Sequence, residues 1–383
     1  MLRYAMGLVA LLTIFSSCES EFKLTGEYEE KPLIYGLLDP NDNPGSGGDG
    51  HLFRIQKAFL GEESAFVMAL EPDSSYFRYE DLFVEVVEYN GSSETNRWNL
   101  DTVMIATKDT GNPDDNVIDF FGPMQRLYKL NQNIDADRDY EITLKKRPIG
   151  MTSAMTISNM DSVTPIADSK TPIVDASTLS FSRPNQNSAL SNSQRITLVN
   201  TSRDYVNYIL NFSTAERGKQ YEVWMSFYYR EIIGGVETLK SIKSLVKTVD
   251  VGTENIVQIP ILSENFFSRI GSVVAEEPGV IRKIGRADGT LGDPFQEGFT
   301  QDLDIEVLIA GDELFAYIDI NNPSNSTVLQ DKPVYTNINN GLGVFSSRTK
   351  VEFVNRLHLS NESLLELVDG QYTKDLGFII DPN

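Results

Sequence analysis

Cysteine and histidine are almost absent from this chain. Cys18 is the only cysteine among 383 residues, and His51 and His358 are the only histidines. After residue 18 the chain can form no internal disulfide bond and offers no thiol nucleophile, so its stability must come from buried apolar side chains. A hydrolase triad or a zinc site would have to use histidines far apart in the sequence, and no Gly-x-Ser-x-Gly motif accompanies either. The sequence predicts no catalytic residue, no metal site and no cofactor.

Long apolar runs are also lacking, except near the start. Ala5–Phe15 is apolar and follows Arg3, but about twenty residues are needed to cross a bilayer. A run of this shorter length is typical of a signal peptide. It leads into a Ser-Ser-Cys sequence ending at Cys18, the lipobox pattern in which the thiol is diacylated and becomes the mature N-terminus. We predict a signal peptide over residues 1–17 and a lipidated tether over 18–30; a plain secretory signal with an incidental cysteine is the alternative.

Positive charge is in short supply. The chain has 33 lysines and arginines against 55 aspartates and glutamates, for a formal net charge of −22. Such a surface repels nucleic acid and anionic lipid headgroups, and it favours solubility and basic partners. Acidic residues directly after Cys18 also resemble the signal that sends some lipoproteins to the cell surface. We therefore predict an outer-membrane location, anchored by lipid and facing the cell exterior, with no nucleic-acid partner.

What is present is alternation of apolar and polar side chains, which indicates half-buried β-strands. Tyr140, Ile142 and Leu144 alternate with polar residues, and residues 221–229 place five apolar side chains on one face. Similar patterns occur at Phe53 and Ile55 and over residues 82–89, 206–212 and 303–309. Polar, turn-rich stretches separate these strands, an arrangement typical of antiparallel sandwiches.

The predicted fold class is mainly β, with two antiparallel β-sandwich-like domains and a few short covering helices. We place an N-terminal β-sandwich at residues 31–160 and a C-terminal β-rich domain at 194–383. The polar stretch 161–193 between them is typical of a linker or crossing loop. Short helices are predicted after Ser263, after Asp312 and over residues 360–368, because each segment begins at a capping residue and continues with helical spacing.

Two loops rich in Asp and Gly invite comparison with calcium sites. Asp39, Asn41 and Asn43 match the first ligands of an EF-hand loop, but Pro44 stands where glycine is required and Gly50 where glutamate is required. A plain loop is therefore favoured. A second cluster over residues 288–293 leads to the same conclusion, although the sequence leaves calcium binding open at both.

Two aromatic residues are the candidate ligand-binding residues. If Val223, Met225 and Phe227 face the core, then Trp224 and Tyr228 lie on the opposite face of the same strand. Aromatic side chains exposed on a sheet can stack on sugars or anchor a partner. The alternative is that a helix or the other domain covers this face.

Several segments resemble a broad family of Bacteroidota outer-membrane lipoproteins of unknown function. They are the lipobox at Cys18 with its acidic neighbours and the stretches 139–144, 150–156, 221–231 and 337–345. The resemblance implies a transthyretin-like or immunoglobulin-like N-terminal sandwich followed by a larger β-rich domain, and it implies no catalytic residues. Within the last stretch, Gly341 and Gly343 beside a short apolar strand predict a tight turn or close backbone packing.

Three functions follow from these observations. The first is a non-catalytic envelope lipoprotein, attached to the membrane through its N-terminal lipid, that binds a macromolecule or serves as an accessory subunit of an outer-membrane complex. The second is a surface glycan-binding module that uses Trp224 and Tyr228. The third is a hydrolase that depends on carboxylates alone. The first is preferred because it needs the least special chemistry.

Overall fold

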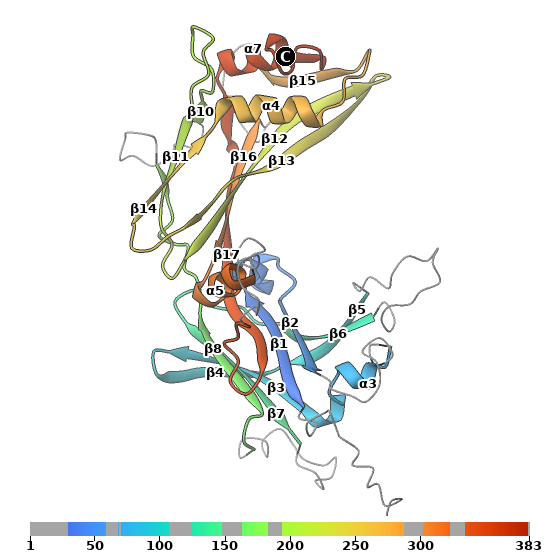
Figure 1. Cartoon of the computed structure of the whole chain (residues 1–383), viewed down its shortest axis with the longest axis vertical. Helices are drawn as coiled ribbons and strands as arrows, with labels where there is room; N and C mark the ends of the chain where they lie inside the picture. Colours follow the sequence, from blue (N-terminus) through green and yellow to red (C-terminus); the bar gives the residue numbers. More distant parts are fainter. Residues whose placement is uncertain are drawn as a thin grey trace, which may run out of the picture.

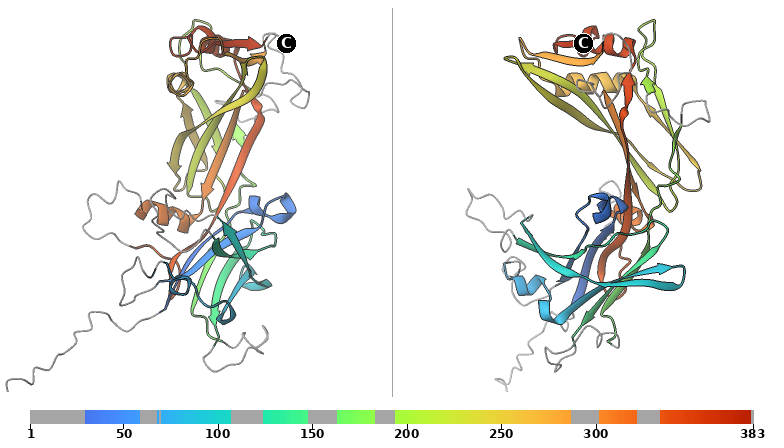
Figure 2. Two further views of the ribbon diagram at one scale, coloured as in Figure 1. Left: turned by 90° about the vertical axis from the view of Figure 1, so that its right-hand side faces the viewer. Right: turned by 180° about the vertical axis from the view of Figure 1, so that it is seen from behind.

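The protein is elongated, with two bodies of β-strands joined by one long strand (Figures 1 and 2). The structure, a computed structural model, describes residues 30–58, 68, 70–106, 124–147, 163–182, 194–286, 302–321 and 334–381. Strands predominate and the helices are short, so the mainly β class is confirmed. The largest sheet is mixed, because some of its neighbouring strands pair in parallel. The two smaller sheets are antiparallel. Cys18, the predicted signal peptide and nearly all of the predicted tether lie outside the described residues.

Eight strands and the shortest helices come from the first half of the chain. They are β1 (Lys31–Leu38), β2 (His51–Ala58), β3 (Leu82–Asn90), β4 (Ser93–Asn99), β5 (Asp101–Ala106), β6 (Met124–Leu130), β7 (Asp139–Lys146) and β8 (Ala167–Pro172), with α3 (Pro72–Ser75) and the 3-10 turns η1 (Pro40–Asp42), η2 (Pro44–Ser46) and η3 (Tyr79–Asp81).

The rest of the chain supplies the three longest strands, β12, β13 and β17, together with shorter ones and three longer helices. The strands are β9 (Phe181–Ser182), β10 (Gln194–Ile196), β11 (Tyr208–Ser213), β12 (Gln220–Ile233), β13 (Val236–Asp250), β14 (Ile256–Ile261), β15 (Ile281–Arg286), β16 (Leu303–Ala310), β17 (Leu342–Leu359) and β18 (Phe378–Asp381). The helices are α4 (Ser263–Val273), α5 (Asp312–Asn321) and α7 (Asn361–Asp369). None of the described helices has the length and apolar character needed to cross a membrane.

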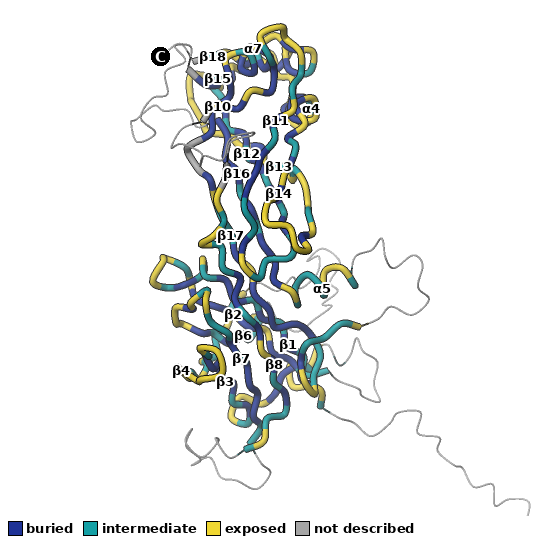
Figure 3. The backbone as a smooth tube through the Cα atoms, turned by 90° about the vertical axis from the view of Figure 1, so that its left-hand side faces the viewer, coloured by how far each residue is buried: buried dark blue, intermediate teal, exposed yellow. Residues whose placement is uncertain are grey.

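Two apolar clusters, which we call the lower core and the upper core, stabilise the two bodies. The lower core joins β1, β2, β3, β6 and β7 and includes Ile34, Phe53, Tyr140 and Phe345. The upper core joins β11, β12, β14, β16, α4 and α7 and includes Phe227 and Phe267, among many others. Figure 3 shows buried residues throughout both bodies. The alternating pattern produces this arrangement, since every second side chain of a strand reaches the same core.

Strand β17 belongs to both bodies. Its first residues pair in parallel with β1, from Leu342 opposite Leu33 to Ser347 opposite Leu38. Beyond Arg348 it pairs antiparallel with β16 in the upper body. An eleven-stranded sheet therefore runs without interruption through the whole molecule. Gly343 makes the lower pairing possible: its φ is +106°, and a Cβ atom there would lie 2.0 Å from the carbonyl oxygen of Ile34. The predicted close backbone packing is thus found at this glycine.

Strand pairing and core packing link the expected linker, residues 161–193, and the end of the chain to the lower body. The described part of the expected linker contains β8, which pairs with β7 and completes the four-stranded sheet β4-β3-β7-β8. Ile338 and Phe345, expected in the C-terminal domain, pack in the lower core. Strand β8 was not predicted because its sequence, Ala-Asp-Ser-Lys-Thr-Pro, is polar and lacks large apolar residues. Strand β17 passes from the lower body to the upper body, which local sequence patterns cannot reveal.

All three predicted helices are present. For α7 the Ser360 hydroxyl accepts from the Ser363 amide, as expected of a capping serine. For α4 the N-cap position is Leu262, and Ser263 is the first helical residue. The Ser263 amide instead donates to the side chain of Asn207, 3.3 Å away, so a residue distant in the sequence satisfies the start of this helix.

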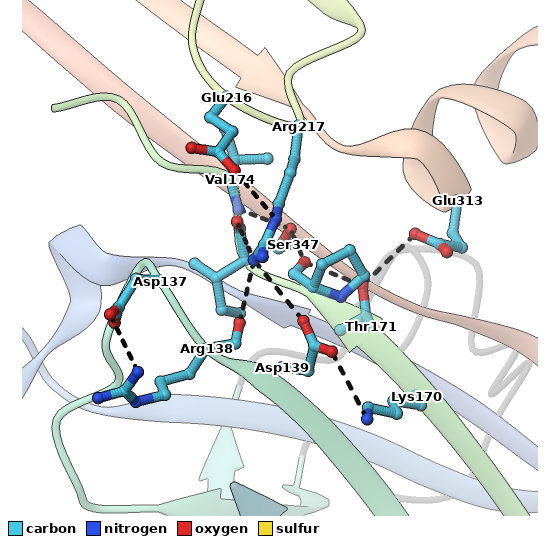
Figure 4. Close-up of polar contacts among 12 residues, drawn as sticks. Asp137, Arg138, Asp139, Lys170, Thr171, Val174, Glu216, Arg217, Glu313 and Ser347 are labelled. Carbon is cyan, nitrogen blue, oxygen red and sulfur yellow. Dashed lines mark hydrogen bonds and ion pairs between the residues drawn. The ribbon is translucent and has the colours of Figure 1, made fainter. Parts of the chain in front are cut away.

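Polar contacts fix the junction between the two bodies (Figure 4). Arg217, in the loop between β11 and β12, has its guanidinium nitrogen 3.6 Å from a carboxylate oxygen of Asp139 in β7. Ser347 of β17 donates to the carbonyl oxygen of Pro172 at 2.7 Å and accepts from the amide of Val174 at 3.1 Å. These bonds attach the end of β8 to β17 where the sheet passes from one body to the other.

Candidate functional site

A groove of about 1000 Å³ opens on the upper body between the β12–β13 hairpin, β14 and α4. The elements β13, β14 and α4 follow one another in the chain, and each contributes residues to the groove. Figure 1 shows all three on the same body. Within the described residues β13 pairs only with β12, and β14 pairs only with β11. Two walls of the groove are therefore edge strands.

Side chains of the upper core form the floor of the groove. Met225 and Phe227 reach it from β12 because they occupy alternate positions on the buried face. Phe266 and Ile270, one turn apart on α4, reach it from the opposite side. The rings of Phe227 and Phe266 meet edge to face with centroids 5.6 Å apart. The floor is accordingly apolar and well packed.

Two exposed leucines are also among the residues that line the groove. Leu245 of β13 is 46% exposed and Leu262, at the start of α4, is 43% exposed, and both line the groove. Single exposed leucines are ordinary on protein surfaces, but leucines on two walls of one apolar groove are typical of a binding site.

The charged residues that line the groove are all cationic. Lys243 and Lys247 come from β13 and Arg269 from α4, and no aspartate or glutamate is among the described residues that line it. The ammonium group of Lys243 lies 2.6 Å from a carboxylate oxygen of Glu306. Neither Lys247 nor Arg269 forms an ion pair with any residue that the structure describes. In a chain of net charge −22 this groove is a local positive site.

The two predicted aromatic residues differ in their position relative to the groove. Trp224 and Tyr228 both lie on the face of β12 away from the upper core and are half-buried. Trp224 lines the groove, its indole N–H donates to Glu222 at 3.2 Å, and the Lys243 ammonium covers its ring at 5.5 Å from the centroid. Tyr228 does not line the groove. Four residues along a strand place the Cα atoms of Trp224 and Tyr228 about 13 Å apart.

The two histidines have structural partners in different bodies. His51 begins β2 and is buried, and its Nε2 lies 3.2 Å from the Oδ1 atom of Asn43. His358 of β17 lies 3.6 Å from a carboxylate oxygen of Asp302, which also accepts from the amide of Leu359 at 3.1 Å. The second contact ties β17 to the segment that precedes β16. These histidines therefore do not meet in one site.

The loop that resembles an EF-hand uses its side chains for internal hydrogen bonds. Asp39 accepts from the amide of Asn41 at 3.0 Å and forms an ion pair with Arg348 at 3.1 Å. The amide group of Asn43 donates to the carbonyl oxygen of Ile134 and accepts from its N–H. In the described ranges no three His, Cys, Asp or Glu residues are grouped so that they could hold a metal ion. The loop thus fastens β1 to β17 and to the chain before β7, while the 288–293 cluster lies outside the described residues.

Sequence reasoning missed Lys247, Arg269, Leu245 and Leu262 as site residues. It predicted α4 and its apolar face, but the groove depends on how far β13 and β14 diverge, which local patterns do not record. The one sequence signal was the excess of lysine over acidic residues between positions 240 and 247 in an acidic chain. No protein-family model matches this chain, and no curated protein matches its sequence.

Proposed function

We propose that the protein is a non-catalytic binding protein of the cell envelope, held on the outer membrane by lipid on Cys18, and that its partner binds in the groove beside α4. The observation that carries this proposal is an apolar groove with a cationic rim on an otherwise acidic protein. The resemblance to Bacteroidota lipoproteins and the arrangement as two sandwiches belong to the same proposal. A role as accessory subunit of an outer-membrane complex is the form that the resemblance supports.

The positions and partners of the carboxylate side chains support a non-catalytic role. A hydrolase that depends on carboxylates needs two of them facing its substrate, whereas the lining of the groove, as far as the structure describes the chain, is apolar, neutral polar or cationic. Buried carboxylates elsewhere have structural partners: Glu85 meets Lys145 at 2.7 Å, and Glu366 accepts from the hydroxyl of Tyr205 at 2.8 Å. These two carboxylates stabilise the fold.

A groove-filling variant with a matched control tests the proposal. Ser272→Trp places a large ring at an exposed position of α4 that lines the groove, whereas Val273→Trp places the same ring at the next exposed position, which does not. The lipidated, C-terminally tagged protein is captured from gently solubilised outer membranes. We expect wild type and Val273→Trp to retain a reproducible partner that Ser272→Trp loses.

Cys18→Ser serves as the control for the anchor, because it should release the protein from the membrane and reduce capture without altering the groove. Equal capture by Ser272→Trp and wild type would place binding elsewhere on the protein. Recovery of the wild-type lipoprotein without any partner, combined with no ligand bound by the purified chain, would contradict the proposal.

A further inference from the structure

We infer that the groove binds a single-chain lipid carboxylate, an apolar chain that ends in one negative charge. This inference rests on the proposed function, since it names the chemistry of the ligand at the same site. It draws on three features of the groove: its apolar interior, its isolated cations and the poor suitability of its walls for adding a strand.

The size and lining of the groove suit one apolar chain. Small-molecule sites are mostly apolar hollows of about 300 to 1000 Å³ with a few placed polar groups, and this groove lies at the upper end of that range. Helix α4, which forms one wall, has 11 residues and is therefore about 16 Å long. A chain lying along it would cover Leu262, the exposed leucine at the start of this helix.

The cations are placed to receive a terminal carboxylate. Lys247 and Arg269 lie on facing walls, are exposed at their ends and carry no ion pair with a described residue. Lys243 is occupied by Glu306, and its charge is largely neutralised. Since the protein as a whole repels anions, two uncompensated cations above an apolar floor give this groove a selectivity for amphipathic anions.

The walls are poorly suited to binding a polypeptide by strand addition. Strand β13 contains three lysines, Lys240, Lys243 and Lys247. Its pairing with β12 has a register shift next to Trp224. Strand β14 contains Pro260, which lacks a backbone donor. Edge lysines, bulges and proline are the features by which proteins prevent an additional strand from pairing. The groove therefore offers side chains to its ligand and few backbone hydrogen bonds.

Fluorescence of Trp224 can report on occupation of the groove. Trp98 lies in β4 in the other body and the chain has only two tryptophans, so Trp98→Phe leaves Trp224 as the single reporter. This variant of the full chain is titrated with decanoate, dodecanoate, dodecanol and dodecylammonium, each below its micelle concentration. We expect saturable binding of dodecanoate, about fourfold tighter binding for each added methylene, weaker binding of dodecanol and the weakest binding of dodecylammonium.

Charge-removing variants separate the headgroup from the chain. Lys247→Gln and Arg269→Gln should each weaken dodecanoate binding by about tenfold and leave dodecanol binding unchanged. Lys240→Gln, on the same strand but outside the groove, should change neither. Equal or tighter binding of dodecylammonium, or full dodecanoate affinity in both groove variants, would overturn the inference.

The outcome also separates this inference from the proposed function. If no amphiphile binds while Ser272→Trp still loses its membrane partner, the groove is a docking site for a protein and the lipid assignment is wrong. If dodecanoate binds and Ser272→Trp blocks it whereas Val273→Trp does not, both the site and the ligand class are supported. Dodecyl phosphate serves as a further arm: tighter binding than dodecanoate would replace the carboxylate by a phosphate headgroup.

Discussion

At the scale of single residues, His51 shows how burial alters a titratable group. Its ring is buried at the start of β2, against the loop that begins at Asp39. Burial lowers the pKa of His51 below its usual range, while the charges of Asp42 and Asp39 and a hydrogen bond with the backbone of Gln132 act in the opposite direction. The folded protein therefore holds this histidine neutral at pH values where the unfolded chain is partly protonated.

This difference predicts that the protein loses stability in mild acid. As the pH falls below about 6.5, the ordinary value for histidine, the unfolded state binds more protons than the folded state, and the free energy of unfolding decreases. The loss continues until the pH reaches the lowered pKa of the folded state. Urea unfolding between pH 8 and pH 5 should show a smaller decrease for His51→Gln than for wild type. Parallel curves for the two proteins would contradict this account.

At the scale of secondary-structure elements, a buried ion pair joins β3 to β7. Lys145 lies 2.7 Å from a carboxylate oxygen of Glu85, and Arg97 of β4 approaches the same oxygen at 3.2 Å. The side chains of Lys145 and Glu85 are almost fully buried. Three strands of the four-stranded sheet thus meet at one carboxylate, and removing a single partner would leave a charge buried without full compensation.

We predict that Lys145→Met lowers the free energy of unfolding by about 3 kcal/mol. The double variant Glu85→Leu/Lys145→Met should lose less than the sum of the two single changes, because it leaves neither charge unpaired. Lys146→Met is the matched control: Lys146 is the next residue, it is more exposed and it pairs with Glu30, so a loss below about 1 kcal/mol is expected. Additive losses in the urea-denaturation cycle would show that the pair does not act as a unit.

Elements with a clear pattern of apolar and polar side chains could be predicted from the sequence, and elements without such a pattern could not. The pattern over residues 221–229 predicted β12 and its buried face, and the spacing of Phe266, Phe267 and Ile270 predicted α4. Strand β8 escaped prediction because its short polar side chains are buried by neighbouring strands through long-range pairing. The groove escaped for a related reason: it depends on how β13, β14 and α4 come together in space, and no single one of these segments records that arrangement.

At the scale of the whole molecule, the shared strand β17 should couple the two bodies. One sheet includes strands from both cores, and Arg217 and Ser347 add polar contacts at the junction. We predict a single cooperative thermal transition by calorimetry. The double variant Arg217→Ala/Ser347→Ala should lower the transition temperature and retain one transition. Two well-separated transitions in the wild-type protein would show that the bodies unfold independently in spite of the common strand.

Strand β17 comes late in the sequence, and this position determines when the lower core can be completed during synthesis. The first strand of the lower core pairs with residues of β17, and Asp39 meets Arg348 across 309 positions of sequence. A chain that emerges N-terminus first therefore presents β1 and β2 long before the strand that lies beside them exists. Closing so long a loop is slow, so the lower core stays incomplete until residues 342–347 are available to pair with β1.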